Sequence, residues 1–304
     1  MKNLRQQGVA VVMALLLTAL AVTIVTGLFW RQQVQLRLVE NQQTRLQQQW
    51  LMRDLLDWAR LLLVEDDRRS NVDHEGEAWA RQLSAIPSLN VARPSDAVLV
   101  ARLNDAQARF NLNNLSNGGK VNPVETAVFA RLLNRLKINT QLAQSAAESL
   151  AALQRSDTGD INAMRMRIWH LDDLLTVRGF TAETVAKLRD LVVVLPGATP
   201  INLNTAPPEI LAALFNNMSA GDSMSLVEER RRAYYRDAAD FAQRIRSRNL
   251  PVPAAQTSFN SRFFLVQSEV RLKNAALQSQ SLVERNNGQT RVVWSREEEP
   301  SWEP

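Results

Sequence analysis

The feature that most constrains this chain is a long uncharged segment close to its start. The run Val9–Phe29 holds 21 residues without a single charge. At about 1.5 Å per residue, a helix of that length crosses the roughly 30 Å hydrocarbon core of a bilayer. The run exceeds the roughly 7–15 residue apolar core of a secretory signal, and bulky residues after Gly27 leave no small-x-small cleavage site. The segment therefore predicts one membrane-spanning helix.

A short basic leader precedes this segment and ends in glycine. It carries Lys2 and Arg5 and stops at Gly8. A leader of this kind in front of a long apolar helix resembles the type IV prepilin signal. That resemblance implies cleavage after Gly8 by a prepilin peptidase on the cytoplasmic side and methylation of the new N-terminus at Val9. The alternative is an ordinary uncleaved signal anchor in which Gly8 stands by chance.

The fifth residue after Gly8 departs from the usual pilin pattern. Most pilins carry glutamate there, whereas this chain has Met13. A carboxylate inside a bilayer is costly unless it has a partner, and in pilins that partner is the N-terminal ammonium of the subunit ahead. A subunit at the very tip has no subunit ahead of it, so an apolar residue is favoured. Met13 therefore predicts a tip subunit or a relative that does not assemble.

Composition describes a globular protein with a single apolar segment. Of 304 residues, 45% are hydrophobic and 22% are charged, and the formal net charge is +5. No run of five like charges occurs, so the charge pattern favours neither nucleic acid nor anionic lipid. The lack of cysteine excludes disulfides and thiolate sites. The sequence has no nucleophile elbow, metal triad or phosphate-binding loop, so we do not expect an enzyme.

The helical pattern continues beyond the membrane segment. Residues 31–63 contain no glycine or proline and are rich in glutamine, leucine and arginine. Four apolar side chains fall on one face of such a helix, at Leu51, Leu55, Trp58 and Leu62. We expect one helix of about 50 residues, apolar first and amphipathic second. The alternative is an anchor followed by a coiled-coil stalk, for which about one repeat of the stripe is too little.

An acidic polar stretch at 65–80 follows the predicted helix. Its groups with metal-binding potential are Asp73, His74, Glu75 and Glu77. No second histidine stands at ligand spacing from His74, so a solvated loop is favoured over a metal site.

Two strand-like segments come next, and a helical block follows them. The patterns at 97–103 and 106–112 predict strands, with Asn104-Asp105 at the turn between them. Between 113 and 258 the strand signals fade and helical periodicity dominates. We interpret this block as an all-α insertion.

Strand patterns return after the helical block. They cover 259–272 and 290–295, and Asn286-Asn287-Gly288 between them has the composition of a hairpin turn. Strands on both sides of a helical block predict one sheet with a helical domain inserted in it.

The motif Asn-Leu-Asn occurs twice, once on each side of position 195. Its asparagines are Asn111, Asn113, Asn202 and Asn204. Such side chains bond local backbone and start helices. In the second copy we expect Thr205 or Asn204 to be the N-cap, with Pro207 and Pro208 in the first helical turn, where N–H groups are spare.

The second copy also resembles the helix-hairpin-helix unit of DNA-uptake proteins. In that unit a Gly-rich hairpin binds phosphate, and no such hairpin follows the helix in this chain. The segment 175–188 has one glycine beside Arg178, with acidic residues nearby. A membrane-anchored DNA-binding protein of competence is therefore the alternative function, and a simple helix-start device is the plainer interpretation of the motif.

Several segments in order resemble one known family. They are the prepilin-type leader without the fifth-position glutamate, 105–113, 171–180, 201–214 and 263–272. This set resembles general secretion pathway protein K, the large minor pseudopilin of type II secretion. The resemblance implies an α+β pseudopilin fold, in which a long N-terminal helix packs on a small antiparallel sheet and a large all-α domain is inserted in the sheet region.

The resemblance also implies a division of the chain and a function. The expected parts are a prepilin leader at 1–8, a transmembrane helix at 9–29, a spine helix with the first strands at 30–112, the inserted α-helical domain at 113–258, C-terminal strands at 259–295 and a disordered tail at 296–304. The expected function is non-enzymatic. The subunit would cap the tip of the type II pseudopilus and take part in the export of folded proteins across the outer membrane.

Partners and location follow from the same resemblance. The implied partners are minor pseudopilins I and J, then H, together with prepilin peptidase and the inner membrane, and no nucleic acid. The implied location is the bacterial inner membrane, single-pass, with the N-terminus cytoplasmic and the bulk periplasmic. Basic residues flank both ends of the span, so charge alone leaves the orientation open. Some relatives bind calcium in loops, and here Asp157 and Asp160 are the only weak candidates.

Overall fold

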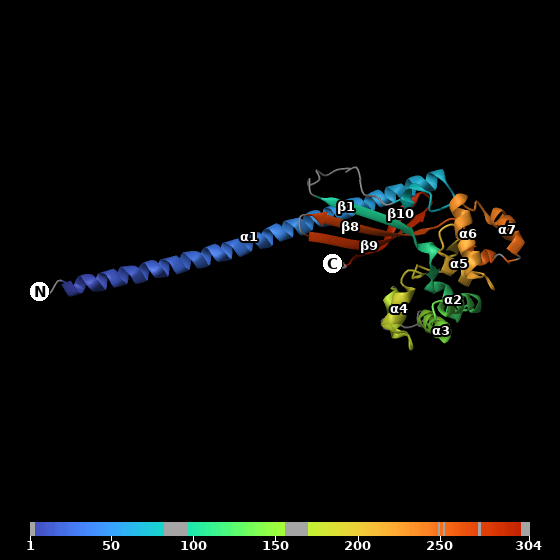
Figure 1. The fold of residues 1–304 in the computed structure, drawn as a ribbon, viewed down its shortest axis with the longest axis horizontal. Helices are drawn as coiled ribbons and strands as arrows, with labels where there is room; N and C mark the ends of the chain where they lie inside the picture. Colours follow the sequence, from blue (N-terminus) through green and yellow to red (C-terminus); the bar gives the residue numbers. More distant parts are fainter. Residues whose placement is uncertain are drawn as a thin grey trace.

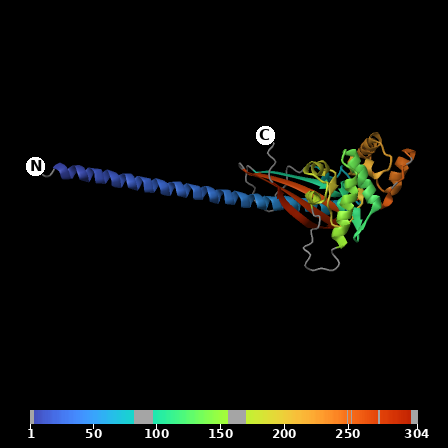
Figure 2. The ribbon, with the colours of Figure 1, turned by 90° about the horizontal axis from the view of Figure 1, so that it is seen from below.

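The computed structural model shows an elongated molecule, a long helical rod that carries a body at one end (Figure 1). The structure describes residues 4–81, 97–155, 170–248, 250–251, 253–272 and 275–298. The body has two parts. A sheet packs along the last part of the rod, and a helical block lies beyond the end of the sheet (Figure 2).

Helix α1, Leu4–Arg69, forms the rod. It has 66 residues, more than the roughly 50 that the sequence pattern suggests. The first proline of the chain comes only at position 87, so no residue forces the helix to end earlier. Residues 11–43 are exposed, whereas the later part of α1 packs on the sheet.

The buried face of α1 differs slightly from the expected stripe. Every fourth residue is buried, at Leu51, Leu55, Ala59 and Leu63. Of the predicted stripe, Leu51 and Leu55 are buried, whereas Trp58 and Leu62 are only partly buried. The small side chain of Ala59 lets the helix approach the sheet closely, and the contact follows the i, i+4 row.

One antiparallel sheet of four strands supports the helix. The strands are β1 (Val98–Asp105), β8 (Phe263–Leu272), β9 (Ala275–Asn286) and β10 (Gln289–Glu298), in the order β1-β8-β9-β10. The β9–β10 hairpin turns at Asn287 and Gly288, both with positive φ (49° and 73°), as the Asn-Asn-Gly sequence predicts. Since β1 and β8 are neighbours in the sheet, the helical block is an insertion between adjacent strands.

Two strand predictions need correction. The segment 106–112 is not a strand that pairs with β1, because β1 continues through Asp105 and the chain then enters 3-10 turn η2 (Ala106–Ala108). Strand β9 went unpredicted because its first half is rich in glutamine and serine and lacks an apolar alternation. Its pairing with β8 on one side and β10 on the other makes it a central strand nevertheless.

The helical block contains helices joined by short turns and strands. Its helices are α2 (Pro123–Arg135), α3 (Gln141–Arg155), α4 (Ala182–Leu188), α5 (Pro208–Leu214), α6 (Ala220–Arg232) and α7 (Ala238–Ile245). Its 3-10 turns are η3 (Leu112–Leu115), η5 (Leu171–Thr176), η6 (Arg246–Arg248) and η7 (Ala254–Gln256), while η1 (Ala78–Ala80) follows α1. A small ladder joins β3 (Ser116–Asn117) to β4 (Lys120–Val121).

Two short parallel ladders divide the block into halves. In the first half β2 (Phe110–Asn111) pairs with β5 (Val192–Val193), and in the second β6 (Ile201–Asn202) pairs with β7 (Thr257–Ser258). Each half therefore begins at one Asn-Leu-Asn motif and closes on its own ladder. One apolar core spans both halves, from Phe110, which stacks on Phe129, to Tyr235.

Candidate functional site

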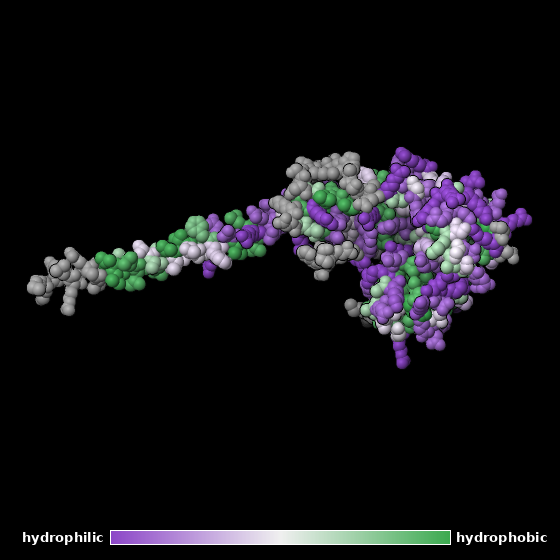
Figure 3. Space-filling view, viewed as in Figure 1, coloured by the Kyte–Doolittle hydropathy of each residue, from purple (hydrophilic) through white to green (hydrophobic). Residues whose placement is uncertain are grey.

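Helix α1 offers an apolar surface that no described part of the chain covers. Residues 11–30 are all exposed, and Figure 3 shows apolar side chains along this part of the rod. Among the described residues, α1 is the one helix long and apolar enough to cross a membrane. Met13 lies on this surface with 59% of its area exposed. Such a surface is stable against lipid or other apolar helices.

The polar groups of this helix are satisfied within it. The hydroxyls of Thr18, Thr23 and Thr26 donate to backbone carbonyls three or four residues earlier, at 2.9, 2.8 and 2.8 Å. A threonine that bonds its own helix carries no unpaired hydroxyl into hydrocarbon. Gly8 and Val9 lie in α1 as well, but their side-chain surroundings are outside the described part of the structure.

A buried polar junction joins the sheet to the helical block. Its centre is Asp105, at the end of β1. The Oδ2 atom accepts hydrogen bonds from the Thr205 hydroxyl at 2.5 Å, the Ser261 hydroxyl at 2.6 Å and Asn202 Nδ2 at 3.0 Å. The Oδ1 atom accepts one from the backbone N–H of Gln107 at 2.8 Å. One carboxylate thus ties together β1, the segment before β8 and the second half of the block.

Burial and hydrogen bonding act on Asp105 in opposite directions. Burial disfavours the charged form and raises the pKa of Asp105 to about 6, against the effect of the hydrogen bonds from Ser261 and Thr205. The four donors stand where a cation would otherwise be needed, and they make this charge tolerable in the interior.

A second buried carboxylate, Asp73, anchors the loop that follows α1. Arg285 of β9 donates to its two oxygens at 2.5 and 2.7 Å and to Asp66 at 2.9 Å. The guanidinium also lies 4.8 Å from the ring centroid of Phe264. Burial acts to lower the pKa of Arg285, but the charges of Asp73 and Asp66 outweigh it and raise the pKa. The pair fastens the end of α1 to the sheet.

Acidic groups crowd this joint. Asp66, Asp73 and Glu77 each place a carboxylate oxygen within 4.8 Å of the others. Burial, with the charges of Glu77 and Asp73, raises the pKa of Asp66 to about 7. The expectation of a solvated loop is wrong for Asp73, which is 2% exposed. The cause is tertiary, because the arginine that draws Asp73 inward lies about two hundred residues away.

The first Asn-Leu-Asn copy links the start of the block to the segment after β5. Asn111 Oδ1 accepts from the backbone N–H of Asn113 at 3.1 Å, which caps η3, and from that of Leu195 at 3.1 Å. Its Nδ2 donates to the carbonyl of Gly197 at 2.8 Å. Asn113 Nδ2 donates to the Leu195 carbonyl at 2.6 Å. Both asparagines therefore make long-range bonds as well as local ones.

The second copy behaves in the same way. Asn202 Oδ1 accepts from the backbone N–H of Asn204 at 2.9 Å, while its Nδ2 reaches the junction at Asp105. Asn204 pairs with the backbone of Tyr235 on both sides, accepting from its N–H at 2.8 Å and donating to its carbonyl at 2.9 Å. These bonds join the β6 turn to the loop between α6 and α7.

The expected N-cap of the following helix is wrong. Helix α5 begins at Pro208, and Pro207 stands at the N-cap position with no side-chain cap. Thr205 lies three residues before the start of the helix, and its hydroxyl donates to Asp105. A proline at the first helical position lacks the N–H that a cap would satisfy, so the helix loses little.

Gly179, the glycine in the segment that resembles a DNA-binding hairpin, has a packing role. Its φ is +100°, a conformation that favours glycine, and a Cβ there would lie 2.6 Å from the Leu142 side chain. It lets the turn between η5 and α4 pack against α3. This contact accounts for the glycine without any phosphate ligand.

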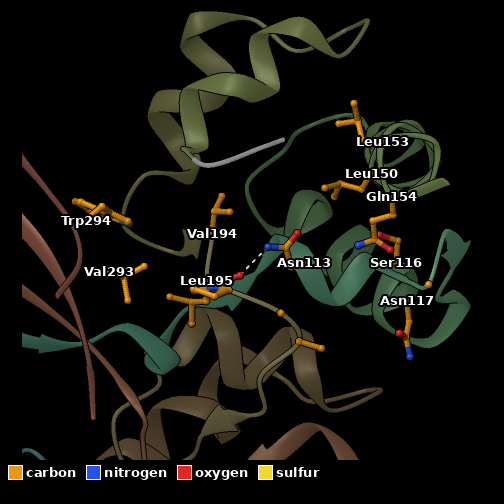
Figure 4. A pocket seen from close by; sticks show the side chains of 14 residues that line it. Asn113, Ser116, Asn117, Leu150, Leu153, Gln154, Val194, Leu195, Val293 and Trp294 are labelled. Carbon is orange, nitrogen blue, oxygen red and sulfur yellow. Dashed lines mark hydrogen bonds between the residues drawn. The ribbon is translucent and has the colours of Figure 1, made fainter. Parts of the chain in front are cut away.

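An apolar groove lies between the first half of the block and the sheet. Figure 4 shows Leu150 and Leu153 of α3 facing Val194 and Leu195 across it, with Trp294 of β10 on the sheet side. Its volume is about 500 Å³. The candidate calcium ligands Asp157 and Asp160 belong to the segment after α3 and lie outside the described residues.

Known proteins resemble this chain over nearly its whole length. Two family models match, both described as type II secretion system (T2SS), protein K, one over residues 108–197 and the other over 201–260. A Pseudomonas aeruginosa type II secretion system protein K is 28% identical over 318 residues, covering 95% of this chain and 92% of the relative. A Klebsiella pneumoniae protein of the same name is 24% identical, covering 97% of both chains.

The chain belongs to the type II secretion system protein K family. This family forms part of the secretion apparatus and is not an enzyme family. The fold agrees with that of a solved protein K chain in the GspK-GspI-GspJ complex from enterotoxigenic Escherichia coli. That chain has a TM-score of 0.69 and 22% identity, and the match covers 86% of this chain and 99% of the other. The α+β fold with a long N-terminal helix is therefore confirmed.

The boundary between the two protein K models coincides with the division seen in the structure. The first model ends at residue 197 and the second begins at 201, where β6 starts. The second Asn-Leu-Asn copy falls within protein K sequence, so the family assignment favours secretion over the DNA-binding alternative. Sequence reasoning missed Asp105, Ser261 and Arg285, because each looks ordinary until the fold brings distant segments together.

Proposed function

We propose that this chain is a minor pseudopilin at the tip of the type II secretion pseudopilus, which caps the fibre and takes part in the export of folded proteins. The placement of the helical block carries the proposal. The block lies beyond the sheet, at the end of the molecule opposite the N-terminus of α1 (Figures 1 and 2). In a fibre of parallel helices it would occupy the place of the next subunit, so assembly would continue only from below.

The proposal includes single-pass anchorage in the inner membrane, with the N-terminus cytoplasmic and the body periplasmic. The exposed apolar surface of α1 supports it. Prepilin peptidase would cleave after Gly8 and leave a methylated Val9. The borders of the sequence-based division belong to the same proposal, except that β10 continues through Glu298 and the tail therefore cannot begin at 296. Mass analysis of the N-terminus of the membrane-purified protein tests the processing step. Methylated Val9 supports it, and an intact Met1 overturns it.

We further propose that minor pseudopilins I and J, followed by H, assemble with this chain. The solved Escherichia coli complex holds GspI and GspJ together with GspK. In this chain α1 exposes Leu46, Trp50 and Leu61 beyond the membrane-spanning part, at 50%, 59% and 55% of their areas. Large apolar side chains on a polar stretch of helix are typical of a protein contact.

Co-purification tests the assembly. The full chain is produced with I and J of the same bacterium, and the complex is isolated in uncharged detergent through a tag on I. We expect the three proteins to elute together. Trp50→Gln with Leu61→Gln should release this chain, while the matched pair Gln42→Asn and Gln43→Asn should not. Elution of an I–J pair without the unmodified chain would contradict the proposal.

A further inference from the structure

Arginines gather around the loop between α6 and α7. Residues 225–248 contain seven arginines, no lysine and four acidic residues, an excess of three positive charges. We name its exposed arginines with one exposed tyrosine the arginine tip and define it as Arg231, Arg232, Tyr234, Arg236 and Arg246; Glu228 and Asp237 are the exposed acidic residues of the region. Figure 1 places α6 and α7 at the end of the molecule far from the N-terminus.

The inner arginines of this region have structural duties. Arg230 is 6% exposed and donates to the backbone carbonyl of Leu203 at 2.9 Å. Arg244 donates to the carbonyl of Ala233 and to Asp240. Arg248 bonds Glu229 at 2.5 Å. The best-placed acceptors are therefore already occupied by arginines that hold the fold.

The outer arginines are left with weak partners or none. Arg231 pairs with Glu228 at 2.7 Å, but both side chains are 60% exposed, so solvent screens the pair. Arg236 reaches Asp240 at 3.7 Å and shares it with Arg244. Arg232 and Arg246 have no carboxylate within 4.0 Å among the described residues.

An aromatic side chain is held rigidly among these charges. Tyr234 is 40% exposed, and its ring stacks on His74 with centroids 4.1 Å apart and planes at 9°. His74 belongs to the loop after α1, so the stack also fixes the arginine tip to the rest of the body. Arginine and tyrosine are, with tryptophan, the residues most enriched at the energetic centres of protein interfaces.

Arginine, more than lysine, suits one class of partner. Its planar guanidinium binds a carboxylate through two parallel hydrogen bonds, and a cluster of such forks recognises acidic side chains. We propose that the arginine tip binds an acidic segment of another protein that lies ahead of the fibre. This inference rests on the proposed function, which places this end of the molecule at the front.

A binding assay with the full chain in uncharged detergent, alone and in the complex with I and J, tests the inference. The probe is a fluorescent peptide of alternating glutamate and serine, and its glutamine counterpart is the uncharged reference. Both are titrated by fluorescence anisotropy at about 50 and about 300 mM NaCl, since screening weakens exposed charge contacts. An oligonucleotide of equal charge competes, because the second Asn-Leu-Asn copy also resembles a DNA-binding unit.

The test variant is Arg232→Gln with Arg246→Gln, and the matched control is Lys120→Gln with Arg178→Gln. Both pairs remove two exposed positive charges from the helical block. Arg232 and Arg246 also stand at helix C-terminal ends, where positive charge stabilises the helix, so thermal unfolding is recorded for every variant.

We expect the test pair to weaken peptide binding about tenfold and the control pair less than about twofold, as local charge pairs dominate over net charge. The inference is overturned if the glutamate peptide does not bind better than the glutamine peptide. It is also overturned if both pairs weaken binding equally, or if the oligonucleotide binds more tightly than the peptide. Recovery of the complex with I and J from the same samples separates failure of the tip contact from failure of the proposed assembly.

Discussion

Asp105 holds two distant segments at the end of β1, the one before β8 and the turn after β6. It bonds the backbone of its own turn, the hydroxyl before β8 and two side chains of the β6 turn. No arginine of the described residues forms an ion pair with it, so hydrogen-bond donors compensate its charge there. Asp73 solves the same problem with a guanidinium from β9. Asp105 lies where the sheet joins the helical block, and Asp73 lies in the loop that follows α1. Together their hydrogen bonds fix the direction in which the block projects from the sheet.

Asp105→Asn tests this role at the level of one atom. An amide keeps one acceptor oxygen but replaces the other with an NH2 group that has two N–H donors, so this group would face donors from which Asp105 accepts. We expect a loss of about 2–3 kcal/mol in the free energy of unfolding, as for an unsatisfied buried polar group. Urea titration followed by tryptophan fluorescence measures it. Asp190→Asn, on an exposed aspartate, is the control and should change stability by less than about 0.5 kcal/mol.

The raised pKa values of Asp66 (about 7) and Asp105 (about 6) predict a pH dependence. Unfolded, both carboxyls titrate near 3.8, so between that pH and 7 the native state holds protons that the unfolded state has released. The contribution of these two carboxyl groups to the free energy of unfolding is complete at low pH, and it disappears as the pH rises through 6 to 7. We expect a higher urea midpoint at pH 5 than at pH 8. Asp66→Asn should reduce the difference, and a midpoint that rises with pH would contradict the assignment.

At the scale of elements, the helical block repeats one arrangement twice. A two-residue strand leads into an asparagine-capped turn, helices follow, and a second short strand returns parallel to the first. Neither ladder is long enough to be stable alone. The shared core and the asparagine bonds to the segment after β5 and to the α6–α7 loop hold the ladders in place. Glycine matters where two of these elements approach closely.

Gly179→Ala tests the packing of the η5–α4 turn on α3. The new Cβ would meet Leu142 at 2.6 Å in a backbone with φ of +100°. We expect a loss of about 2–3 kcal/mol, from strain and overpacking together. Gly197→Ala is the matched control, since φ is +79° there and the space is open. The control should cost about 1 kcal/mol. Equal losses in the two variants would remove the packing contribution from the explanation.

At the scale of the whole molecule, the free part of the rod is apolar and uncovered, and the body at the opposite end is bulky and polar (Figure 3). The sheet and the rod meet along the buried row of α1, and the block extends past them. A subunit of this shape packs beside others along its helix and leaves little room above itself. In the proposed function, capping and anchoring therefore belong to opposite ends of the molecule.

Met13→Glu tests the tip position. A glutamate there would have no ammonium ahead of it, and an unpaired charge in hydrocarbon costs about 3 kcal/mol. We expect less of the chain in the complex with I and J, and less export of a secreted protein by the host bacterium. Met13→Gln keeps the size without the charge and should retain more of both. Full assembly and export by the glutamate variant would show that this position meets a partner after all.

The sequence alone carried the parts of the fold that depend on local pattern. Uncharged length predicted the membrane helix, the absence of glycine and proline predicted its extension, and strands on either side of a helical block predicted the insertion. The sequence pattern did not predict segments whose secondary structure depends on their neighbours in the fold. The first half of strand β9 is polar, so its side chains do not indicate a strand. Pairing with β8 and β10 supplies the stability that these side chains lack.

The candidate site divides in the same way. The leader, Met13 and the two Asn-Leu-Asn motifs are visible in sequence because their chemistry is local or positional. The partners of Asp105 and Asp73 appear only in the folded chain, where residues up to about two hundred positions apart share a hydrogen bond. Sequence determined that this chain has an anchor, a sheet and a helical insert. Tertiary structure decided where the insert points, because buried charges are stable only in the arrangement that supplies their partners.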